Sequence, residues 1–301
     1  MDDESALAEL AALAESGVIV AIVGPTASGK TELACRLAER IGGEVVSVDS
    51  VQVYRRFDIG SGKPTADELA RAPHHAVSVL DPDEPIDAAR YASLANSAID
   101  DIRARGRRPI VCGGTFLWVK ALLHGLAEAP PASAEVRARH AAIVDSGGRE
   151  ELHRRLKEVD APSAARLHPN DVLRVGRALE VFELTGERMS AIQERHAFRE
   201  VRHEARLVAR RLDTVDLTAR ITRRVEGWLD EGWVDEVKAL LDAGYGEARA
   251  MGSVGYCEVR AHVRGELTRD ELAGAIVRAT RVFARRQRTW LNSADVRWLS
   301  G

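Results

Sequence analysis

Two hydrophobic patterns alternate along the first 130 residues of the chain. Continuous apolar runs lie at residues 18–23, 45–48, 77–80 and 109–112, and segments with helical spacing of apolar residues, such as 33–41 and 88–104, separate them. Buried parallel strands have short apolar sequences, and the helices that connect them cover both faces of the sheet. We therefore predict an α/β fold with a parallel sheet flanked by helices.

A long helical stretch interrupts this alternation after Pro130-Pro131. The stretch from Ala134 to about Arg195 reads as consecutive helices, with breaks near Gly147-Gly148, at Pro162, at His168-Pro169-Asn170 and at Gly186. The α/β pattern then returns, with a strand at 205–212, helices at 216–230, 233–243 and 268–292, and a short strand at 296–299. An all-helical insertion within an α/β core explains this order.

The same patterns predict where the domains begin and end. We assign residues 17–132 and 200–301 to a catalytic core and residues 133–199 to the helical insertion domain. Residues 1–16 are acidic and rich in alanine, and we treat them as an N-terminal extension that could be disordered. A chain of 301 residues is long enough for one large domain and one smaller domain.

Composition excludes several classes of protein. No apolar run approaches the roughly 20 residues that a membrane-spanning helix needs, and the chain does not open with a basic and then apolar leader. We expect a cytoplasmic protein that has no membrane partner and is a monomer. The isolated cysteines Cys35, Cys112 and Cys257 argue against a disulfide framework or a zinc finger, and we expect them to be small buried apolar residues.

Charge is distributed unevenly along the chain. Residues 1–100 hold 8 Lys and Arg against 17 Asp and Glu, whereas residues 101–301 hold 35 against 29. Within the basic part, helical spacing places four arginines on one face of a helix: Arg278, Arg281, Arg285 and Arg288. Such a stripe suits a phosphate backbone. For an arginine run taken alone, however, we favour a solvated face paired with scattered carboxylates.

The segment from Gly24 to Thr31, Gly-Pro-Thr-Ala-Ser-Gly-Lys-Thr, fits the phosphate-binding loop pattern and directly follows an apolar run. Glycines let successive backbone N–H groups point into one concavity, and a helix that begins near Lys30 adds the positive end of its dipole. Lys30 would reach the terminal phosphate, and the Thr31 hydroxyl would hold Mg²⁺. An ordinary glycine-rich turn is the alternative. The loop alone names no reaction, because kinases, switches, motors and transferases share it.

The second apolar run leads into a carboxylate, in Ser47-Val48-Asp49-Ser50. The carboxyl ends of strands in an open α/β sheet face the ligand crevice, so Asp49 should point into that crevice. A carboxylate there could bind metal, accept a proton from a nucleophile or cap the next helix. Spacing alone leaves these three possibilities open.

Two glycine-containing stretches lie where they could complete a site. They are Cys112-Gly113-Gly114-Thr115 and Asp58-Ile59-Gly60-Ser61-Gly62-Lys63-Pro64. Paired glycines permit close approach of the backbone to a ligand, and Thr115 would add a hydroxyl; tight turns are the alternative for both stretches. The 109–112 strand lacks the terminal acidic residue that many nucleoside-triphosphate hydrolases use for Mg²⁺, which weakens a motor or switch function.

These motifs occur together in an order that resembles the bacterial tRNA dimethylallyltransferase family, also called the tRNA isopentenyltransferase or IPP transferase family. The resemblance extends from about Val18 to about Leu299. It depends on Gly24 to Thr31, Ser47 to Tyr54, Asp58-Ile59-Gly60 with Lys63-Pro64, Gly113-Gly114-Thr115, His168-Pro169-Asn170-Asp171 through Arg177-Ala178-Leu179-Glu180, Gly255-Tyr256, and Arg286-Gln287 with Thr289-Trp290. It implies a P-loop core sheet with an inserted helical domain that binds tRNA.

The resemblance further implies transfer of a dimethylallyl group from dimethylallyl diphosphate to N6 of the adenosine 3′ of the anticodon in tRNA. Asp49 would then hydrogen-bond the amine and take its proton, beside Thr115. Mg²⁺ would be the cofactor, with Thr31 helping to hold it. The residues implied at the diphosphate are Gly24, Thr26, Ala27, Ser28, Gly29, Lys30, Thr31 and Arg224.

The resemblance implies contacts with the tRNA anticodon arm from several segments. The residues are Asp49, Ser50, Val51, Gln52, Thr115, Arg137, Leu173, Arg174, Val175, Gly176, Arg177, Gly252, Ser253, Val254, Gly255, Tyr256 and Cys257. Arg174 and Arg177 suit phosphate contacts. The alternative for 171–184 is an ordinary amphipathic helix with Leu173, Leu179, Val181 and Phe182 mostly in the core, and both interpretations can hold at once. Cys257 stands where the family commonly has a basic residue, and Ser61-Gly62 where it commonly has Thr-Ala.

Rival functions remain open on the sequence. A small-molecule kinase would share the loop, the sheet and a carboxylate after the second strand, and would leave a nucleoside diphosphate in place of diphosphate. A nucleotide-gated RNA-binding protein would keep all its function after Asp49→Asn. Prenylation of a free adenine nucleotide is a third alternative, which the long helical insertion disfavours. We interpret Trp228 and Trp233 as core or interface residues and His74-His75 as a loop pair.

Overall fold

The computed structural model of the chain describes residues 3–299. The chain forms two compact units, one comprising Met1–Leu123 and Arg202–Gly301, the other His124–Val201. The division therefore falls at 123/124 and 201/202, whereas the sequence placed it at 132/133 and 199/200. The difference arises because helix α5 (Phe116–His124) ends the first segment of the core, and the linker after it belongs with the helices that follow.

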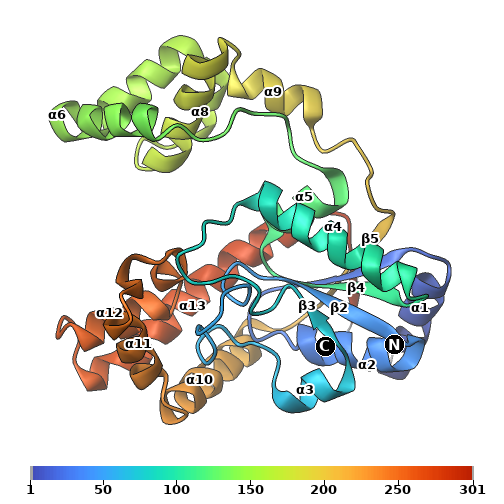
Figure 1. Cartoon of the computed structure of the whole chain (residues 1–301). Helices are drawn as coiled ribbons and strands as arrows, with labels where there is room; N and C mark the ends of the chain where they lie inside the picture. The colour runs from blue at the N-terminus through green and yellow to red at the C-terminus, as the bar shows by residue number, and fades with distance from the viewer. Residues whose placement is uncertain (1–2, 300–301) are drawn as a thin grey trace. The chain divides into compact units, whose positions relative to one another are not determined.

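The first unit contains a six-stranded sheet of order β3-β2-β4-β1-β5-β6, in which every pair of neighbours is parallel (Figure 1). The α/β fold predicted from the alternating pattern is confirmed. The strands are β1 (Ile19–Val23), β2 (Gly43–Val48), β3 (His74–His75), β4 (Arg108–Gly113), β5 (Ala205–Arg210) and β6 (Val296–Leu299).

One strand prediction is wrong. The apolar run 77–80 forms no strand, and only Leu80 makes an isolated bridge, to Tyr54. Ala76 and Ser78 both have positive φ, at 60° and 52°, which an extended strand does not allow. The pairing with β2 moves instead to His74-His75, so this pair is a short strand and not a loop.

Helices cover both faces of the sheet, with α4 and α5 on one side and α2 and α3 on the other (Figure 1). Apart from an N-terminal helix that precedes β1, the remaining helices of this unit follow β5. The bounds are α2 (Lys30–Ile41), α3 (Ala66–Arg71), α4 (Ala88–Ala104), α10 (Thr214–Asp230), α11 (Trp233–Asp242), the 3₁₀ turns η1 (Tyr245–Glu247) and η2 (Arg249–Gly252), α12 (Tyr256–Val263) and α13 (Arg269–Asn292).

The expectation that the N-terminal extension is disordered is wrong for the part that the structure describes. Residues Asp3–Glu15 form helix α1, and Leu7 and Leu10 are buried against the core that α2 shares with the sheet. Glu9 pairs with Arg297 of the last strand. The alanine-rich composition suits a helix, since alanine has the highest helix propensity, and the apolar face then docks. Residues 1–2 of the predicted extension and 300–301 of the predicted core lie outside the described residues.

The second unit is all-helical, as predicted. Its helices are α6 (Ala134–Val159), α7 (Ala161–Arg166), α8 (Val172–Thr185) and α9 (Met189–His196). Gly148 has a non-helical φ of 78° inside α6, and Gly186 caps α8 at φ 73°, so both predicted glycine breaks are confirmed. Pro162 begins α7 near its first residue, and the break itself lies at Asp160. Leu152, Leu156, Val175 and Leu179 form the core of this unit.

Candidate active site

The carboxyl ends of β1, β2 and β4 meet at one edge of the sheet, because these three strands are neighbours and parallel. The phosphate-loop segment follows β1, Asp49 follows β2 and Thr115 follows β4. In parallel sheets this edge is where ligands bind. The three motifs that the sequence singled out are therefore brought together.

The segment 24–29 has the geometry of a phosphate-binding loop. Helix α2 begins at Lys30, with Gly29 as its N-cap at φ 80° and no side-chain cap, so the first N–H groups of the helix remain available to an anion. Ala27 is held at φ 63°, a conformation that costs energy for a residue with a side chain. The prediction of a helix that begins near Lys30 is confirmed.

The loop contains an unsatisfied hydroxyl. The Ser28 side chain is 2% exposed, and its Oγ has no hydrogen-bond partner among the described residues. A Cβ on Gly24 would lie 2.9 Å from this Oγ, so a side chain at position 24 would force the Ser28 hydroxyl to move. Because buried hydroxyls are normally hydrogen-bonded, a phosphate oxygen is a suitable missing partner.

Lys30 lies in a desolvated position within this loop. Burial lowers the pKa of its ammonium group to about 8, and the nearby Arg224 adds to the decrease, while Asp49 opposes it. Its Nζ donates to Pro25 O at 2.7 Å. A bound phosphate would supply the negative charge that this ammonium lacks, so the site is suited to an anion.

The residues at the loop fit a metal only in combination with an anionic ligand. Among residues 3–299 no group of three His, Cys, Asp or Glu side chains is placed to hold a metal. Thr31 offers one half-buried hydroxyl. Mg²⁺ usually binds proteins through one or two ligands and takes its other positions from water and phosphate oxygens, and this donor set fits that mode.

Further arginines lie around the loop. A Cβ on Gly29 would be 3.8 Å from Arg220 Nη1 and 3.9 Å from Arg210 Nη1, so both guanidinium groups lie beside the loop. Arg224, one helical turn after Arg220 on α10, lies over the Trp228 ring at 5.4 Å. Of these three arginines, the family resemblance implied only Arg224. The four-residue spacing between Arg220 and Arg224 on one helix could have indicated Arg220. The position of Arg210 beside the loop, by contrast, results from the pairing of β5 with β1.

Asp49 and Thr115 are joined through the backbone between them. Asp49 Oδ1 accepts hydrogen bonds from Val51 N at 2.9 Å and Gln52 N at 3.2 Å. Thr115 Oγ1 accepts from Ser50 N at 3.2 Å, and Thr115 N donates to Val48 O at 3.2 Å. One carboxylate oxygen of Asp49 thus acts as a turn cap, and the other, Oδ2, has no partner among the described residues.

The paired glycines before Thr115 have a packing role in this structure. A Cβ on Gly113 would lie 2.2 Å from Val48 O, and one on Gly114 would lie 2.4 Å from Gln287 Nε2. They allow β2 and α13 to come close to this turn, and the approach of a ligand to the backbone here stays a prediction.

Gln287 of α13 connects the two halves of the site, a role that the sequence analysis did not assign. Its Oε1 accepts from Thr26 N at 3.0 Å, and its Nε2 donates to Gly114 O at 3.0 Å. The side chain is 6% exposed. Because the Thr26 N–H is already bonded to Gln287, the diphosphate contact predicted for Thr26 would use its side chain.

The Asp58–Lys63 stretch is held by an internal network. Lys63 Nζ donates to Tyr54 O and to Asp58 Oδ1, both at 2.6 Å. Glu236 accepts from Asp58 N, Ile59 N and the Tyr256 hydroxyl. A Cβ on Gly60 would overlap Trp233, at 2.0 Å, which is 1% exposed and confirms the prediction of a core residue.

The segment predicted to contact tRNA around this network is only partly accessible. Tyr256 is fully buried, so its side chain packs in the core and makes no contact with RNA in this structure. Gly255 is buried against Trp233 at φ 91°. The accessible positions are Gly252, Ser253, Val254 and Cys257.

Of the three thiols, Cys35 and Cys112 are buried, as expected, and Cys257 is half-buried. Burial raises the pKa of the Cys112 thiol to about 12 and those of Cys35 and Cys257 to about 11. A thiolate nucleophile is therefore not favoured at any of the three.

A buried glutamate organises the predicted tRNA arginines within the helical unit. Glu180 is fully buried and accepts from Arg177 Nη1 at 2.8 Å, Arg137 Nε at 3.2 Å and Ser133 N at 2.7 Å. Burial alone would raise the pKa of Glu180, but these hydrogen bonds lower it, so the carboxylate stays charged. The structure thus brings Arg137 and Arg177 together.

The start of α8 divides its predicted contacts between surface and core. Leu173 is 88% exposed, so the alternative that placed it in the core is wrong. The Arg174 side chain is 76% exposed and pairs with Asp171 at 3.3 Å. Val175 is fully buried and packs in the core, which rules out contact between its side chain and a ligand here. Gly176 lies against His140.

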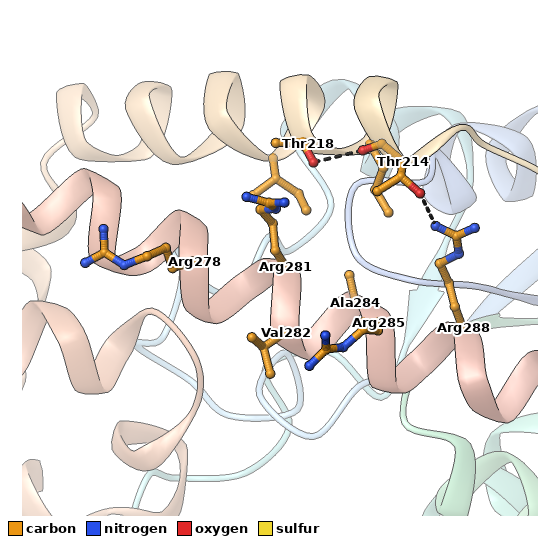
Figure 2. A pocket seen from close by; sticks show the side chains of 10 residues that line it. Thr214, Thr218, Arg278, Arg281, Val282, Ala284, Arg285 and Arg288 are labelled. Carbon is orange, nitrogen blue, oxygen red and sulfur yellow. Dashed lines mark hydrogen bonds between the residues drawn. The ribbon is translucent and has the colours of Figure 1, made fainter.

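The arginine stripe of α13 lines a groove that α10 closes on the other side (Figure 2). Arg288 Nη1 donates to Thr214 Oγ1 at 2.7 Å, and Arg278 contributes to a lowered pKa of Glu271, after the hydrogen bonds from Thr268. The exposed guanidinium groups of Arg281 and Arg285 have no ion pair or hydrogen bond with residues that the structure describes. Pairing with carboxylates therefore does not account for these two.

No helix within residues 3–299 is both long and apolar enough to cross a membrane.

Many curated proteins are similar in sequence to this chain. The family described as IPP transferase matches residues 52–294, and the family described as Isopentenyl transferase matches residues 17–81. A tRNA dimethylallyltransferase from Sorangium cellulosum is 63% identical over 284 residues, which cover 94% of this chain and 90% of the relative.

Solved structures agree with this assignment. The full-length tRNA isopentenylpyrophosphate transferase from Bacillus halodurans is 38% identical with a TM-score of 0.69, over 94% of this chain and 89% of that chain. A eukaryotic dimethylallyltransferase acting on tRNA is 25% identical with a TM-score of 0.79, over 94% of this chain and 73% of that chain. The resemblance inferred from the motifs is confirmed, and the chain belongs to the IPP transferase family.

Proposed function

We infer that this protein transfers a dimethylallyl group from dimethylallyl diphosphate to N6 of the adenosine 3′ of the anticodon in tRNA, with release of diphosphate. The observation that carries this conclusion is the meeting of a phosphate-binding loop with Asp49 and Thr115 at one edge of the sheet. The activities for which the relatives are named, tRNA dimethylallyltransferase and tRNA isopentenylpyrophosphate transferase, support the same reaction.

On the donor side, the loop binds the leaving group. The C–O bond to the diphosphate breaks, and negative charge accumulates on its oxygens. The N–H groups at the start of α2, the Ser28 hydroxyl, Lys30 and Arg224 would stabilise that charge more strongly in the transition state than in the substrate. Mg²⁺ bound by Thr31 and the diphosphate oxygens would neutralise part of the same charge.

On the acceptor side, Asp49 receives a proton. The nitrogen lone pair of the exocyclic amine attacks the dimethylallyl carbon as that carbon leaves the diphosphate, and the N6 proton passes to Asp49 Oδ2. An aromatic amine is a poor nucleophile, and a positioned general base contributes about 10²–10⁴-fold to the rate. Oδ1 keeps its two backbone hydrogen bonds throughout, so the carboxylate does not need to move.

We propose that the tRNA anticodon arm contacts both compact units. The reacting adenosine must leave the stacked loop, as in other enzymes that act on a base. Ser50, Val51, Gln52 and Thr115 surround Asp49 in the first unit, and Gly252, Ser253, Val254 and Cys257 are accessible there. Among the contacts predicted in the second unit, the accessible positions are Arg137, Leu173, Arg174, Gly176 and Arg177. Cytoplasmic location, a monomeric state and Mg²⁺ as the metal belong to the same proposal.

The test incubates the protein with dimethylallyl diphosphate, Mg²⁺ and unmodified tRNA whose anticodon is followed by adenosine, and measures nucleoside masses after digestion. We expect an adenosine heavier by one dimethylallyl group, and no product when Mg²⁺ is removed with a chelator. If a relative of known activity forms the product and this protein does not, the proposal is wrong. A panel of small acceptors with ATP then tests the kinase alternative.

A further inference from the structure

Gln287 is the only side chain for which the structure gives hydrogen bonds to both the phosphate-loop segment and the Thr115 turn, among residues 3–299. Its amide accepts from Thr26 N and donates to Gly114 O, each at 3.0 Å. It therefore uses one atom on the half of the site that binds the donor and one on the half that binds the acceptor.

The contact is built closely into the site. Gly114 has no space for a side chain, since a Cβ there would lie 2.4 Å from Gln287 Nε2 and 3.0 Å from Gly24 O. Beside it, Trp290 of the same helix stacks on Phe116, with ring centroids 4.0 Å apart and planes at 10°. Helix α13 is thus anchored on the Thr115 turn by an aromatic stack and by the Gln287 amide.

The linkage continues from Gly114 to the proposed base. The next residue, Thr115, accepts from Ser50 N, and the neighbouring Asp49 is fixed by its own turn. A continuous chain of hydrogen bonds and backbone runs from Thr26 through Gln287 and Gly114 to Thr115 and Asp49. It lies beside the pairing of β1, β4 and β2, which places the phosphate loop and the carboxylate at the same sheet edge.

We propose that Gln287 is a positioning residue, which holds the diphosphate loop and the Asp49–Thr115 turn at the spacing needed for in-line transfer. This inference rests on the proposed function, because the spacing matters only if a donor and an acceptor bind on the two sides. Each half would still bind its own substrate without the bridge. The ternary complex would lose its alignment, and a misplacement of about 1 Å can cost about 10²-fold in rate.

The first experiment compares Gln287→Met with the wild type. Met has a similar length and no amide, so both bridging hydrogen bonds disappear. We expect kcat to fall about 10²-fold, while the Kd of dimethylallyl diphosphate alone and the Kd of tRNA alone each change less than about threefold. The matched control is Ile276→Val, a buried substitution elsewhere on α13, which should leave kcat unchanged.

The second experiment uses Gln287→Glu as a variant whose hydrogen bonding depends on pH. The carboxylate can accept from Thr26 N but repels Gly114 O, whereas the protonated acid has the donor and acceptor pattern of the amide. Burial raises the pKa of a carboxyl group, so protonation should occur within the assay range. We expect the ratio of kcat for Gln287→Glu to kcat for wild type to rise as pH falls from about 8 to about 6, and the Gln287→Met ratio to stay flat.

The outcomes separate the inference from the proposed function. If wild-type protein prenylates tRNA but Gln287→Met retains full kcat, or loses kcat and both affinities together, the positioning role is overturned. A Gln287→Glu ratio that does not change with pH also counts against it. If wild-type protein gives no prenylated adenosine in the same assay, the proposed function itself is wrong.

Discussion

Asp49 divides its two carboxylate oxygens between local structure and the proposed chemistry. Oδ1 caps the turn through Val51 N and Gln52 N, while Oδ2 is left for a substrate proton. The sequence left capping and proton transfer as alternatives, and the geometry allows both in one residue. A substitution that removes only the proton-accepting oxygen can therefore separate them.

Asp49→Asn is that substitution. The amide oxygen can retain the turn cap, but the amide nitrogen cannot accept the N6 proton. We expect kcat to fall by about 10²–10⁴-fold with the Kd of dimethylallyl diphosphate within about threefold of wild type, measured by single-turnover kinetics and by calorimetry. Unchanged turnover would support an RNA-binding protein without chemistry. Equal loss of turnover and diphosphate binding would contradict the role as base.

Lys30 gives the binding of the donor a specific pH dependence. Desolvation lowers the pKa of the ammonium group to about 8, so the cation is lost as pH rises through that value. We expect the affinity for dimethylallyl diphosphate to fall above about pH 8 in the wild type and to fall much less in Lys30→Arg, because a guanidinium stays charged. Lys30→Ala should bind weakly at every pH. Calorimetry between about pH 7 and about pH 9 would measure this affinity for each protein. Identical pH profiles for wild type and Lys30→Arg would contradict the role of the Lys30 charge.

At the scale of elements, α13 has two faces with different surroundings. Leu272, Ile276, Gln287 and Leu291 are buried, and Gln287 reaches the site, whereas the arginine stripe faces the groove with α10 (Figure 2). Arg281 and Arg285 are exposed cations without a protein partner within the described chain. Such cations are available to a phosphate backbone, the interpretation that the sequence analysis ranked second.

The double variant Arg281→Gln/Arg285→Gln tests that interpretation. If both residues contact phosphates, tRNA should bind more weakly at low salt, and the slope of log Kd against log salt should decrease by about 1 for each lost contact. Binding of dimethylallyl diphosphate should not change. Arg269→Gln, at an exposed position at the start of the same helix, is the control. An unchanged salt slope would indicate that the arginine stripe is a solvated face that does not contact phosphates.

At the scale of the whole molecule, α1 belongs to the first compact unit. Leu10 is fully buried against the core that contains α2 and strands β1, β2 and β4, and the Glu9–Arg297 pair joins the helix to the last strand. The helix therefore contributes to the stability of the core, although no site residue lies on it.

We expect Leu10→Ala to destabilise the protein by about 2–5 kcal/mol, because it removes buried methyl groups and leaves a cavity. Chemical denaturation would measure this free energy of unfolding. The kcat at a temperature where the variant is folded should equal that of wild type. Ala8→Ser, at an exposed position of the same helix, should cost only about 0.5 kcal/mol through helix propensity and leave kcat unchanged. A Leu10→Ala variant as stable as wild type would show that α1 is not docked in solution.

The amino-acid sequence by itself determined the features that depend on local order. The phosphate loop, the strand before it, the helix that begins at Lys30 and the glycine breaks at 148 and 186 follow from spacing and backbone preference within a few residues. The family followed from motifs in order along the chain. The positions of Asp49 and Thr115 at one sheet edge followed from the rule that parallel strands align their carboxyl ends.

Only the tertiary structure decided which residues meet across long separations. Gln287 reaches Thr26 across 261 positions and Gly114 across 173, and no local pattern contains such a contact. The burial of Val175 and Tyr256, the exposure of Leu173 and the placing of Arg210 beside Gly29 likewise depend on how whole elements pack. Periodicity shows that a residue lies on a face, but packing determines what that face meets.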